Sequence, residues 1–308
     1  MEPTETACSQ TGITGMMDWA HLSSRALLAI TGPDRLDFLN GLITQSIPEN
    51  APFFSALLLH NGRFFTDFFG MHLGETLLLD CAKAHHADLC HFLTPYSLLH
   101  NVYLHDATHH YAVCAAIGPE AGALINDPLI QNYRSQGSIV YTDPRNALMG
   151  LRACVPYAIW NELPTPIMNP CNESAYHRQR IQLGIAEGAY DLIHRQSIIL
   201  EYGYHNHHAI SWTKGCYMGQ ELMARTFHRG MVRKKIYSIH LTDGHFPESG
   251  SELFALLSDG TGVQRVGWMG SHCDASGLAV IHESALSPQL VLYTDSSMAG
   301  KFSVTLSM

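Results

Sequence analysis

One short segment, residues 214–225, gathers the residue types that covalent chemistry and ligand binding need. It places a cysteine and a tyrosine between two glycines and follows them with good helix formers. Glycine lets a backbone turn sharply, and the first turn of a helix presents free N–H groups with partial positive charge. A thiol just before such a helix should react more readily than an ordinary cysteine. The candidate residues are Lys214, Gly215, Cys216, Tyr217, Gly219, Gln220, Glu221 and Arg225.

These residues also have a structural interpretation. A cysteine is most often a small buried hydrophobic side chain, and Glu221 with Arg225 forms an i,i+4 pair that would only support the helix, by about 0.3 kcal/mol. The 8 cysteines show no Cys-x-x-Cys pair and no regular spacing, so we expect free thiols and neither a disulfide framework nor a zinc site. Because glycines and charged residues surround Cys216, it is the candidate catalytic thiol.

The composition excludes several classes of protein. The 308 residues are 46% hydrophobic, which is enough chain for two or three domains with their own cores. The longest apolar runs are far shorter than the ~18 residues of a membrane-spanning helix, and the first residues lack the apolar core of a secretion signal. We therefore expect a soluble, cytoplasmic protein with no membrane partner. Lys and Arg total 18 against 27 Asp and Glu, a formal charge of -9, which argues against nucleic acid as a partner.

The order of predicted elements indicates an α+β fold with antiparallel sheets. A strand over 26–30 precedes a helix that begins near Pro33. Asn61-Gly62 joins two apolar runs and predicts a tight hairpin in which both turn residues have positive φ. A helix over 83–93 is expected to stop before Pro95. Strands and helices do not alternate strictly, so a doubly wound parallel sheet is not expected.

The rest of the chain divides into a second α+β unit and a β-rich end. Strands and a helix over 172–183, ended by Gly184, follow a break near 130–137. Beyond Val232 only short strands with Gly, Asp and Ser turns remain, and closing them into a small barrel would remove their exposed edges. The predicted units are a flexible tail over 1–17, an α+β domain of two subdomains over 18–231, and a C-terminal β-barrel over 232–308.

The run Lys-Gly-Cys-Tyr-Met-Gly-Gln-Glu at 214–221, followed by Ala-Arg-Thr, resembles the signature of the YgfZ family. Members of this family are folate-binding proteins that act in the assembly or repair of iron–sulfur enzymes. Segments 27–44, 61–69, 143–145 and 180–184 agree with the family in order. The resemblance implies the fold of the glycine-cleavage aminomethyltransferase, with intertwined ferredoxin-like antiparallel subdomains, a terminal β-barrel and a central channel that holds tetrahydrofolate.

Two residues outside the segment are carried over from this resemblance. The aminomethyltransferases have two acids where this chain keeps one carboxylate, Asp67, and they have Arg-Leu-Glu where this chain has Arg180-Ile181-Gln182. A carboxylate can accept two hydrogen bonds from the amino-pyrimidine edge of a pterin, whereas the Gln182 amide offers one acceptor and one donor group. Asp67 and Gln182 are thus candidate ligand-binding residues, and the sequence leaves the strength of pterin binding open.

We therefore expect an accessory protein that binds tetrahydrofolate and uses Cys216 in the assembly or repair of iron–sulfur enzymes. Its expected partners are a reduced folate and iron–sulfur enzymes or assembly proteins. The alternatives are a folate-dependent aminomethyl or methyl transferase, in which Asp67 polarises the substrate amine, and a non-catalytic scaffold without folate.

Two further groups of residues have competing interpretations. Histidines near the candidate thiol, at 205, 207, 208 and 228, are interpreted as solvated loop residues in preference to a metal site. The basic run 229–235 suits either a solvated face or the mouth of an anion channel for a phosphate or a polyglutamyl tail.

Overall fold

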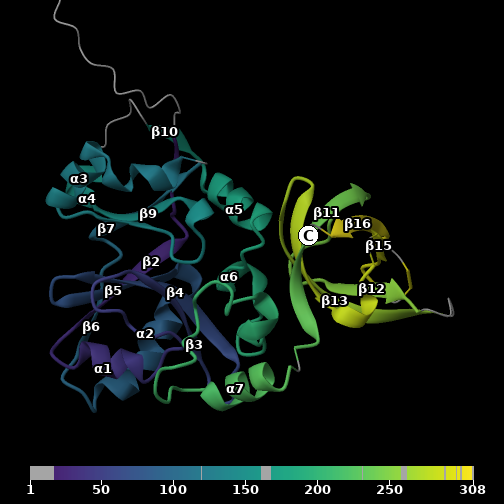
Figure 1. The fold of residues 1–308 in the computed structure, drawn as a ribbon, viewed down its shortest axis with the longest axis horizontal. Helices are drawn as coiled ribbons and strands as arrows, with labels where there is room; N and C mark the ends of the chain where they lie inside the picture. The colour runs from purple at the N-terminus through teal and green to yellow at the C-terminus, as the bar shows by residue number, and fades with distance from the viewer. Residues whose placement is uncertain are drawn as a thin grey trace, which may run out of the picture.

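The computed structural model describes residues 17–118, 120–160, 168–230, 232–257, 262–287, 289–295, 297–298 and 300–306. Residues 1–16 of the expected tail, with Cys8, lie outside these ranges, and the first strand already begins at Met17. The described chain forms two five-stranded sheets and one six-stranded sheet, with helices packed around them (Figure 1).

The first sheet is antiparallel, with the strand order β3-β4-β5-β2-β6. One of its faces packs against helices through Phe38 and Leu89, and the other packs against the second sheet through Phe54 and Phe69. Because both faces are covered, its central strands are apolar on both sides and do not alternate with polar residues. The elements are β2 (Arg25–Thr31), α1 (Arg35–Asn40), β3 (Phe53–Leu58), β4 (Phe64–Leu73), β5 (Thr76–Ala82), α2 (Lys83–Ser97) and β6 (Tyr103–Asp106).

The second sheet has the order β10-β1-β7-β9-β8 and is interleaved with the first along the chain. Strand β1 precedes all strands of the first sheet, and β7 follows them, so β1 must cross over to pair with β7 and, in parallel, with β10. This is the intertwined arrangement that the family resemblance implied. The strands are β1 (Met17–His21), β7 (Tyr111–Ile117), β8 (Ile139–Thr142), β9 (Leu151–Pro156) and β10 (Met168–Cys171).

Short helices surround these sheets, and two of them, α5 and α6, lie between the α+β body and the C-terminal sheet (Figure 1). The α-helices are α3 (Pro128–Ser135), α4 (Tyr157–Trp160), α5 (Glu173–Gln182), α6 (Gly188–Asp191) and α7 (Gln220–His228). The 3-10 helices are η1 (Ala121–Asn126), η2 (Ala147–Met149), η3 (Ile199–Tyr202) and η4 (Glu283–Ala285).

The C-terminal sheet curls into a nearly closed barrel with the order β12-β13-β14-β11-β16-β15. Its two edges meet at Phe254 and Tyr293, whose backbone N–H and C=O groups bond reciprocally at 3.0 and 2.9 Å. The α+β fold followed by a small β-barrel is thus confirmed. The strands are β11 (Lys234–Asp243), β12 (Glu252–Leu256), β13 (Val263–Cys273), β14 (Ser276–His282), β15 (Gln289–Leu292) and β16 (Phe302–Leu306).

The Asn61-Gly62 hairpin is present, but its predicted turn geometry was wrong. Gly62 has a positive φ of 76°, and Asn61 is not among the positive-φ residues of the described chain. Gly62 N–H donates to the Leu59 carbonyl at 2.8 Å, which makes the turn longer than two residues. Such a turn, with one left-handed glycine at its end, accommodates the extra residue as a bulge next to the strands.

The helix expected to stop before Pro95 continues through it. Helix α2 ends at Ser97, with Pro95 in its last turn. A proline removes one backbone N–H from the helical ladder, and within the last turn this forfeits only one hydrogen bond. The rule that a helix stops before proline therefore failed here by one turn.

A buried ionic network joins the two sheets. Arg152 lies within it, and its guanidinium donates to Asp80 Oδ2 at 2.5 Å and to the Tyr176 hydroxyl at 3.0 Å. The same guanidinium stacks on the Phe69 ring, 3.8 Å from its centroid. Tyr176 in turn donates to Glu187 Oε2 at 2.7 Å. The charged members are all buried and each has an ion-pair partner inside the network: Arg25, Arg145, Arg152, Arg180, Asp80, Asp143, Glu187 and Asp191.

The network also fastens the barrel to the α+β body. Asp191 Oδ2 accepts from Arg180 Nη1 at 2.7 Å, and Asp191 Oδ1 accepts from the backbone N and the hydroxyl of Ser271, each at 2.7 Å. Arg180 Nη2 donates to the same hydroxyl at 2.6 Å. Because Ser271 lies on β13, the barrel cannot shift without breaking these bonds.

Replacing Glu187 by Gln should lower the free energy of unfolding by about 3–5 kcal/mol at neutral pH, because buried cations would lose their carboxylate. Burial alone would raise the pKa of Glu187, but Arg25, Arg180 and Arg145 hold it well below its usual range. Such a carboxylate contributes stability above its unfolded pKa of about 4.3, and the contribution is lost as pH falls toward the folded pKa. The difference between wild type and Glu187→Gln should therefore shrink at about pH 3.5, as measured by urea denaturation.

The matched control is Glu283→Gln. Glu283 pairs with Lys235 at 2.5 Å, but both side chains are about half exposed. An exposed pair contributes at most about 1 kcal/mol, so this variant should stay close to wild type. Equal losses in the two variants, or a Glu187→Gln deficit that is constant with pH, would contradict the role assigned to the network.

Candidate functional site

Cys216 lies on an exposed loop that leads into α7. The N-cap of this helix is Gly219, which has a left-handed backbone with φ 79°. Cys216 is three residues before the N-cap, and the field of a helix end falls off within its first turn. The sequence analysis expected the start of the helix to activate the thiol. In the structure the thiol is distinguished by its exposure and not by contact with the helix start.

Gly62 in the β3–β4 turn and Gly219 at the start of α7 pack against each other. A Cβ on Gly219 would lie 2.6 Å from the Leu59 carbonyl oxygen and 3.0 Å from Gly62 Cα. A Cβ on Gly62 would lie 2.5 Å from Leu222 Cβ. Backbone therefore touches backbone between the β3–β4 turn and the start of α7, and a side chain at either position would separate them.

Lys214 anchors the loop that carries Cys216. Its ammonium donates to three carbonyl oxygens at and just after the end of α1, those of Asn40 at 2.7 Å, Ile43 at 2.9 Å and Gln45 at 3.0 Å. Burial lowers the pKa of Lys214 to about 8. An ammonium has three N–H donors, and all three are used here. Lys214 therefore holds the loop in place and has no donor left for a ligand in this arrangement.

The other residues of the segment divide between buried and exposed positions. Tyr217 is buried, which raises its pKa to about 12. Gly215 is exposed, and no atom lies within 4 Å of the place a Cβ would occupy. Glu221 and Arg225 are exposed and pair at 2.6 Å as the expected i,i+4 support of α7. Gln220 is half-buried as the first residue of this helix.

Accessibility separates Cys216 from the other described cysteines. Burial raises the pKa of Cys81 to about 12 and also raises that of Cys154 well above its ordinary value. Cys273 is half-buried, with its thiol 3.7 Å from the Asp274 carboxylate. The cysteines whose pKa burial raises are Cys81, Cys90, Cys114, Cys154 and Cys171.

Asp67 is a buried residue of β4 that contacts the start of α6, and no described contact brings it to the Cys216 loop. Its Oδ2 accepts from the Gly188 N–H at 2.9 Å and from the Tyr204 hydroxyl at 2.7 Å. Its Oδ1 is buried without a hydrogen-bond partner among the described residues. A Cβ on Gly188 would lie 2.7 Å from this oxygen, so glycine keeps the carboxylate uncrowded.

Gln182 is exposed at the last position of α5, and no described hydrogen bond joins its side chain to the buried carboxylates. The acidic residue that the fold buries nearby is Glu187, which sequence reasoning missed. A signal was present, because Glu187 is the one charged residue in the small apolar run 185–189. A charge in such a run is either exposed by a turn or paired in the core.

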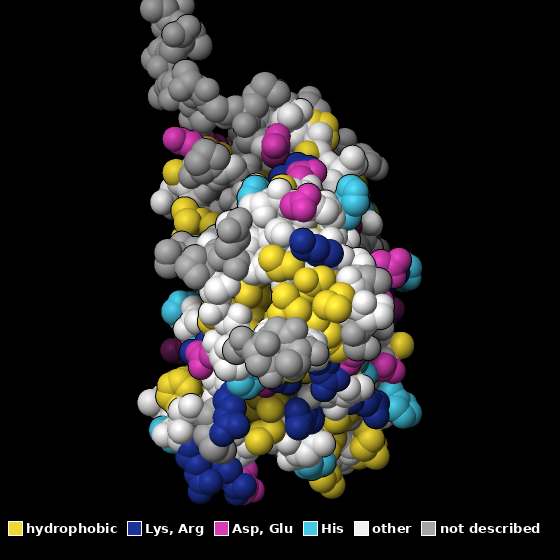
Figure 2. All heavy atoms as spheres, turned by 90° about the vertical axis from the view of Figure 1, so that its right-hand side faces the viewer, with side chains coloured by type: hydrophobic (Ala, Val, Ile, Leu, Met, Phe, Trp, Pro, Cys, Tyr) yellow, Lys and Arg dark blue, Asp and Glu magenta, His cyan; other side chains and the backbone are white. Residues whose placement is uncertain are grey.

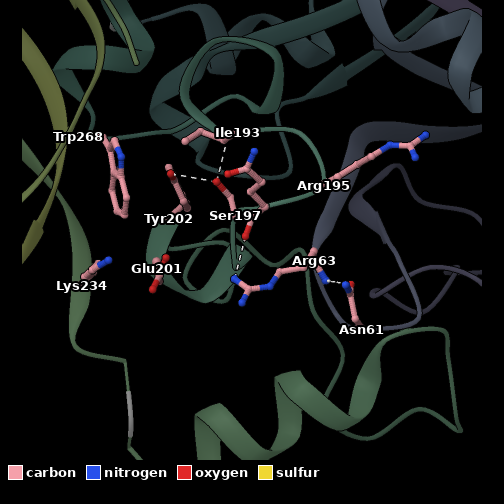
Figure 3. A pocket seen from close by; sticks show the side chains of 10 residues that line it. Asn61, Arg63, Ile193, Arg195, Ser197, Glu201, Tyr202, Lys234 and Trp268 are labelled. Atoms are coloured by element: carbon pink, nitrogen blue, oxygen red, sulfur yellow. Dashed lines mark hydrogen bonds between the residues drawn. The ribbon is translucent and has the colours of Figure 1, made fainter. Parts of the chain in front are cut away.

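A cleft of about 420 Å³ opens between the α+β body and the barrel (Figure 3). Lys234 and Trp268 reach it from the barrel, whereas Arg63 reaches it from the β3–β4 turn. Glu201 is the one carboxylate of its lining, and burial raises the pKa of this group. The lining consists of Asn61, Arg63, Ile193, Arg195, Gln196, Ser197, Glu201, Tyr202, Lys234 and Trp268.

The cleft was only partly predictable. Lys234 belongs to the basic run 229–235, for which the mouth of an anion channel was one of the two interpretations. Arg63 adjoins the predicted Asn61-Gly62 turn. Arg195 and Trp268 carry no local signal, because only tertiary packing brings their segments together. None of the ligand-binding residues predicted from the sequence lines this cleft.

The histidines near the loop do not form a metal site in the part of the chain that the structure describes. No group of three or more His, Cys, Asp or Glu there could hold a metal ion. The interpretation of these histidines as solvated residues also needs correction, because burial lowers the pKa of His207 to about 4.

Within the described ranges, no helix is both long and apolar enough to cross a membrane.

Comparison with known proteins assigns the chain to a family. The human mitochondrial iron–sulfur cluster assembly factor IBA57 is 30% identical over 287 residues, which cover 85% of this chain and 77% of the human protein. This chain belongs to the IBA57 family, within the YgfZ family. The mouse protein of the same name is 28% identical over 299 residues, 90% of this chain and 80% of the mouse protein. No family model matches the chain.

A solved structure shares the fold of this IBA57-family chain. The aminomethyltransferase T of the Bartonella henselae glycine cleavage system superposes with a TM-score of 0.73, covering 95% of this chain and 85% of that one. The two are 13% identical, so the comparison establishes the fold alone. The family and the fold that the Lys214–Glu221 signature implied are therefore confirmed.

Among the described cysteines, Cys216 should be alkylated first by iodoacetamide at neutral pH. It is exposed, whereas burial keeps most of the others protonated and covered. Partial labelling followed by peptide mass spectrometry measures the order of reaction, with Cys273 as the half-buried comparison. Equal labelling of Cys216 and Cys273 would show that exposure does not set the order.

The variant Lys214→Met should loosen the loop while the fold persists. It keeps the aliphatic stem and removes the ammonium, so three carbonyls lose their donor, at a cost of about 1–3 kcal/mol. Amide exchange should quicken at Met218 and Ser211, whose N–H groups bond to Gly41 and Thr44. Hydrogen exchange with mass spectrometry measures this, and Lys83→Met, at an exposed lysine, is the control. Unchanged exchange at 211–218 would contradict the anchoring role.

Proposed function

We propose that this protein is an accessory factor of iron–sulfur cluster assembly that presents Cys216 to a partner and binds a reduced folate. The observation that carries the proposal is the exposed thiol on a loop that Lys214 fixes to three backbone carbonyls. Membership in the IBA57 family supports a role in iron–sulfur cluster assembly. The partners are iron–sulfur enzymes or the proteins that assemble their clusters.

Cys216 suits this role because a thiolate is the ligand type that holds iron–sulfur clusters. A cluster carried by a partner is the cargo, and a fixed, exposed thiol offers it a sulfur donor. Gly215, beside it, leaves open space at its Cβ position, so a partner surface can approach the loop closely. Lys214 keeps the thiol in one place, which lowers the entropy lost when the partner docks.

Tetrahydrofolate is the proposed cofactor, and the residues present fit it in two respects. The buried Asp67 Oδ1 has no partner among the described residues and can accept an N–H from a pterin. Arg63 and Lys234 in the cleft can pair with the carboxylates of the glutamyl end. The exposed Gln182 has no part in this arrangement.

A folate-dependent one-carbon transferase is the second candidate, and the unpartnered Asp67 oxygen is the observation that favours it. In that case Asp67 would polarise the substrate amine. The single carboxylate, held by Tyr204 and Gly188, favours binding over turnover. Release of a one-carbon unit from an aminomethyl or N-methyl donor by the purified full chain would support the transferase.

The accessory role is tested by complementation and by folate titration. In cells that depend on this protein, Cys216→Ser should fold normally but fail to restore iron–sulfur enzyme activity, whereas Cys273→Ser should restore it. Tetrahydrofolate at 100 times its Kd should raise the free energy of unfolding by about 2.7 kcal/mol in wild type and in Cys216→Ser alike.

Full complementation by Cys216→Ser would remove the thiol from the proposal. Absence of any shift in melting temperature at saturating folate would favour the alternative in which the protein is a scaffold that does not bind folate.

The proposed compartment is the cytoplasm, and fractionation of cells that produce the tagged full chain tests it.

A further inference from the structure

Two aromatic side chains beside the Cys216 loop stay exposed to solvent while they stack on each other. Trp212 and Phe227 are 38% and 41% exposed, and their ring centroids lie 4.0 Å apart with an interplanar angle of 21°. His228 packs edge-on against both rings, with centroid distances of 6.5 Å to Trp212 and 5.7 Å to Phe227. Large apolar side chains that are exposed as a group mark binding surfaces, whereas singly exposed ones need no explanation. The stack is therefore a candidate contact for another molecule.

The stack and the thiol belong to one exposed segment. Trp212, Gly215 and Cys216 are exposed, whereas the Lys214 ammonium turns inward to the carbonyls that anchor it. Four residues of chain span at most about 14 Å, which limits the separation of the Trp212 and Cys216 backbones. A protein interface covers about 800 Å² on each partner, a patch about 30 Å across. A protein that docks on Trp212 is therefore large enough to reach Cys216.

The surroundings of the stack are basic. Residues 211–235 contain six Lys or Arg and one carboxylate, Glu221, in a chain whose formal charge is -9. Glu221 is already paired with Arg225. Arg229 and Arg233 are exposed, and neither pairs with a carboxylate within the described ranges. Figure 2 shows Lys and Arg side chains gathered on the lower part of the face that the barrel presents, the end at which α7 lies in Figure 1. An acidic surface would complement these cations.

The stack also has a structural interpretation, in which Trp212 only fastens the loop to α7. Other contacts already hold the loop, because the Lys214 ammonium binds three carbonyls and the Ser211 N–H donates to the Thr44 carbonyl at 2.9 Å. Rings that only fastened the loop would stabilise it most if they were buried, since the gain grows with the apolar area removed from water. Their exposure therefore favours recognition of a partner.

We infer that the protein to which Cys216 is presented docks on the exposed rings and on the unpaired arginines beside them. This inference rests on the proposed function. The partner places an apolar side chain on the rings, with Asp or Glu around it to pair with the arginines. Aromatic and arginine side chains are enriched at the centres of protein interfaces, where a few such anchors dominate the affinity. The residues of this docking site, here called the α7 surface, are Trp212, Phe227, His228, Arg229 and Arg233.

The first test is complementation in cells that depend on this protein. Trp212→Ala and Phe227→Ala should each lower the restored iron–sulfur enzyme activity by about tenfold or more, because each removes an interface anchor. Trp212→Phe keeps an aromatic ring and should restore most of the activity. The control Tyr103→Ala removes a side chain that is 60% exposed on β6, and it should restore full activity. The purified variants should keep the wild-type melting temperature and the wild-type rate of Cys216 alkylation by iodoacetamide.

The second test concerns the charge of the partner. Arg229→Glu and Arg233→Glu should each restore less activity than Arg229→Gln and Arg233→Gln do. A carboxylate at these positions repels an acidic partner, whereas an amide only removes the attraction. The control Lys83→Glu changes an exposed lysine outside the α7 surface and should match wild type.

Two other occupants of the α7 surface are tested with the purified full chain. Sedimentation should show a monomer, and single-stranded RNA should not bind at physiological salt, because the net charge of -9 opposes it. A dimer that Trp212→Ala dissociates, or RNA binding that Trp212→Ala abolishes, would assign the surface to that occupant and overturn the inference.

The outcomes separate the inference from the proposed function. Full restoration by Trp212→Ala and Phe227→Ala, with Cys216→Ser still failing, overturns the docking site and leaves the role of the thiol intact. A loss that comes with a lower melting temperature or slower Cys216 alkylation also overturns it, because the stack then only supports the loop. Equal activities of the Glu and Gln variants overturn the acidic partner. Restoration by Cys216→Ser removes the proposed function, and the inference with it.

Discussion

The buried ionic network is the constraint on which the other contacts depend. Taking an ion out of water costs several kcal/mol, so each buried arginine is stable only where a carboxylate meets it. Here the partners come from separate elements: Arg25 from β2, Asp80 from β5, Arg152 from β9 and Glu187 from the start of α6. A shift of either sheet would leave a charge unpaired in a dry interior. The network therefore fixes the relative position of the two sheets, which hydrophobic packing alone would leave free to slide.

The positions of the cleft and of Asp67 follow from this arrangement. Asp191 ends α6 and binds Ser271 of β13, so it holds the barrel at the distance that opens the cleft. Gly188 begins the same helix and donates to Asp67. One short helix thus connects the network, the barrel and the unpartnered carboxylate. The Cys216 loop is attached differently, through the ammonium of Lys214 and backbone carbonyls.

Local patterns predicted the local features of this molecule. Gly184 ends α5 with a positive φ of 71°, and the spacing of short apolar runs indicated the barrel. The glycines around Cys216 correctly marked a loop before a helix, but they could not show that Lys214 binds carbonyls 170 or so residues earlier in the chain. The exposed Gln182 and the buried Glu187 are five residues apart. The apolar run around Glu187 is compatible with either an exposed or a buried, paired charge, and only its tertiary contacts decide between the two. The cleft joins distant segments, so no window of sequence contains it.

The cleft and the thiol are linked through the close approach of the β3–β4 turn to the start of α7. Asn61 and Arg63 line the cleft on either side of Gly62, and Gly62 touches Gly219, three residues after Cys216. A ligand that pulls on Arg63 therefore acts one residue from the contact that sets the start of α7. Such a ligand changes the loop only if it binds one arrangement of the turn more tightly than another. Because both glycines lack a Cβ and the approach is already close, the turn has little room to move toward α7 and can only retreat from it. A ligand that draws the turn away from α7 would therefore loosen the contact that lies three residues from Cys216.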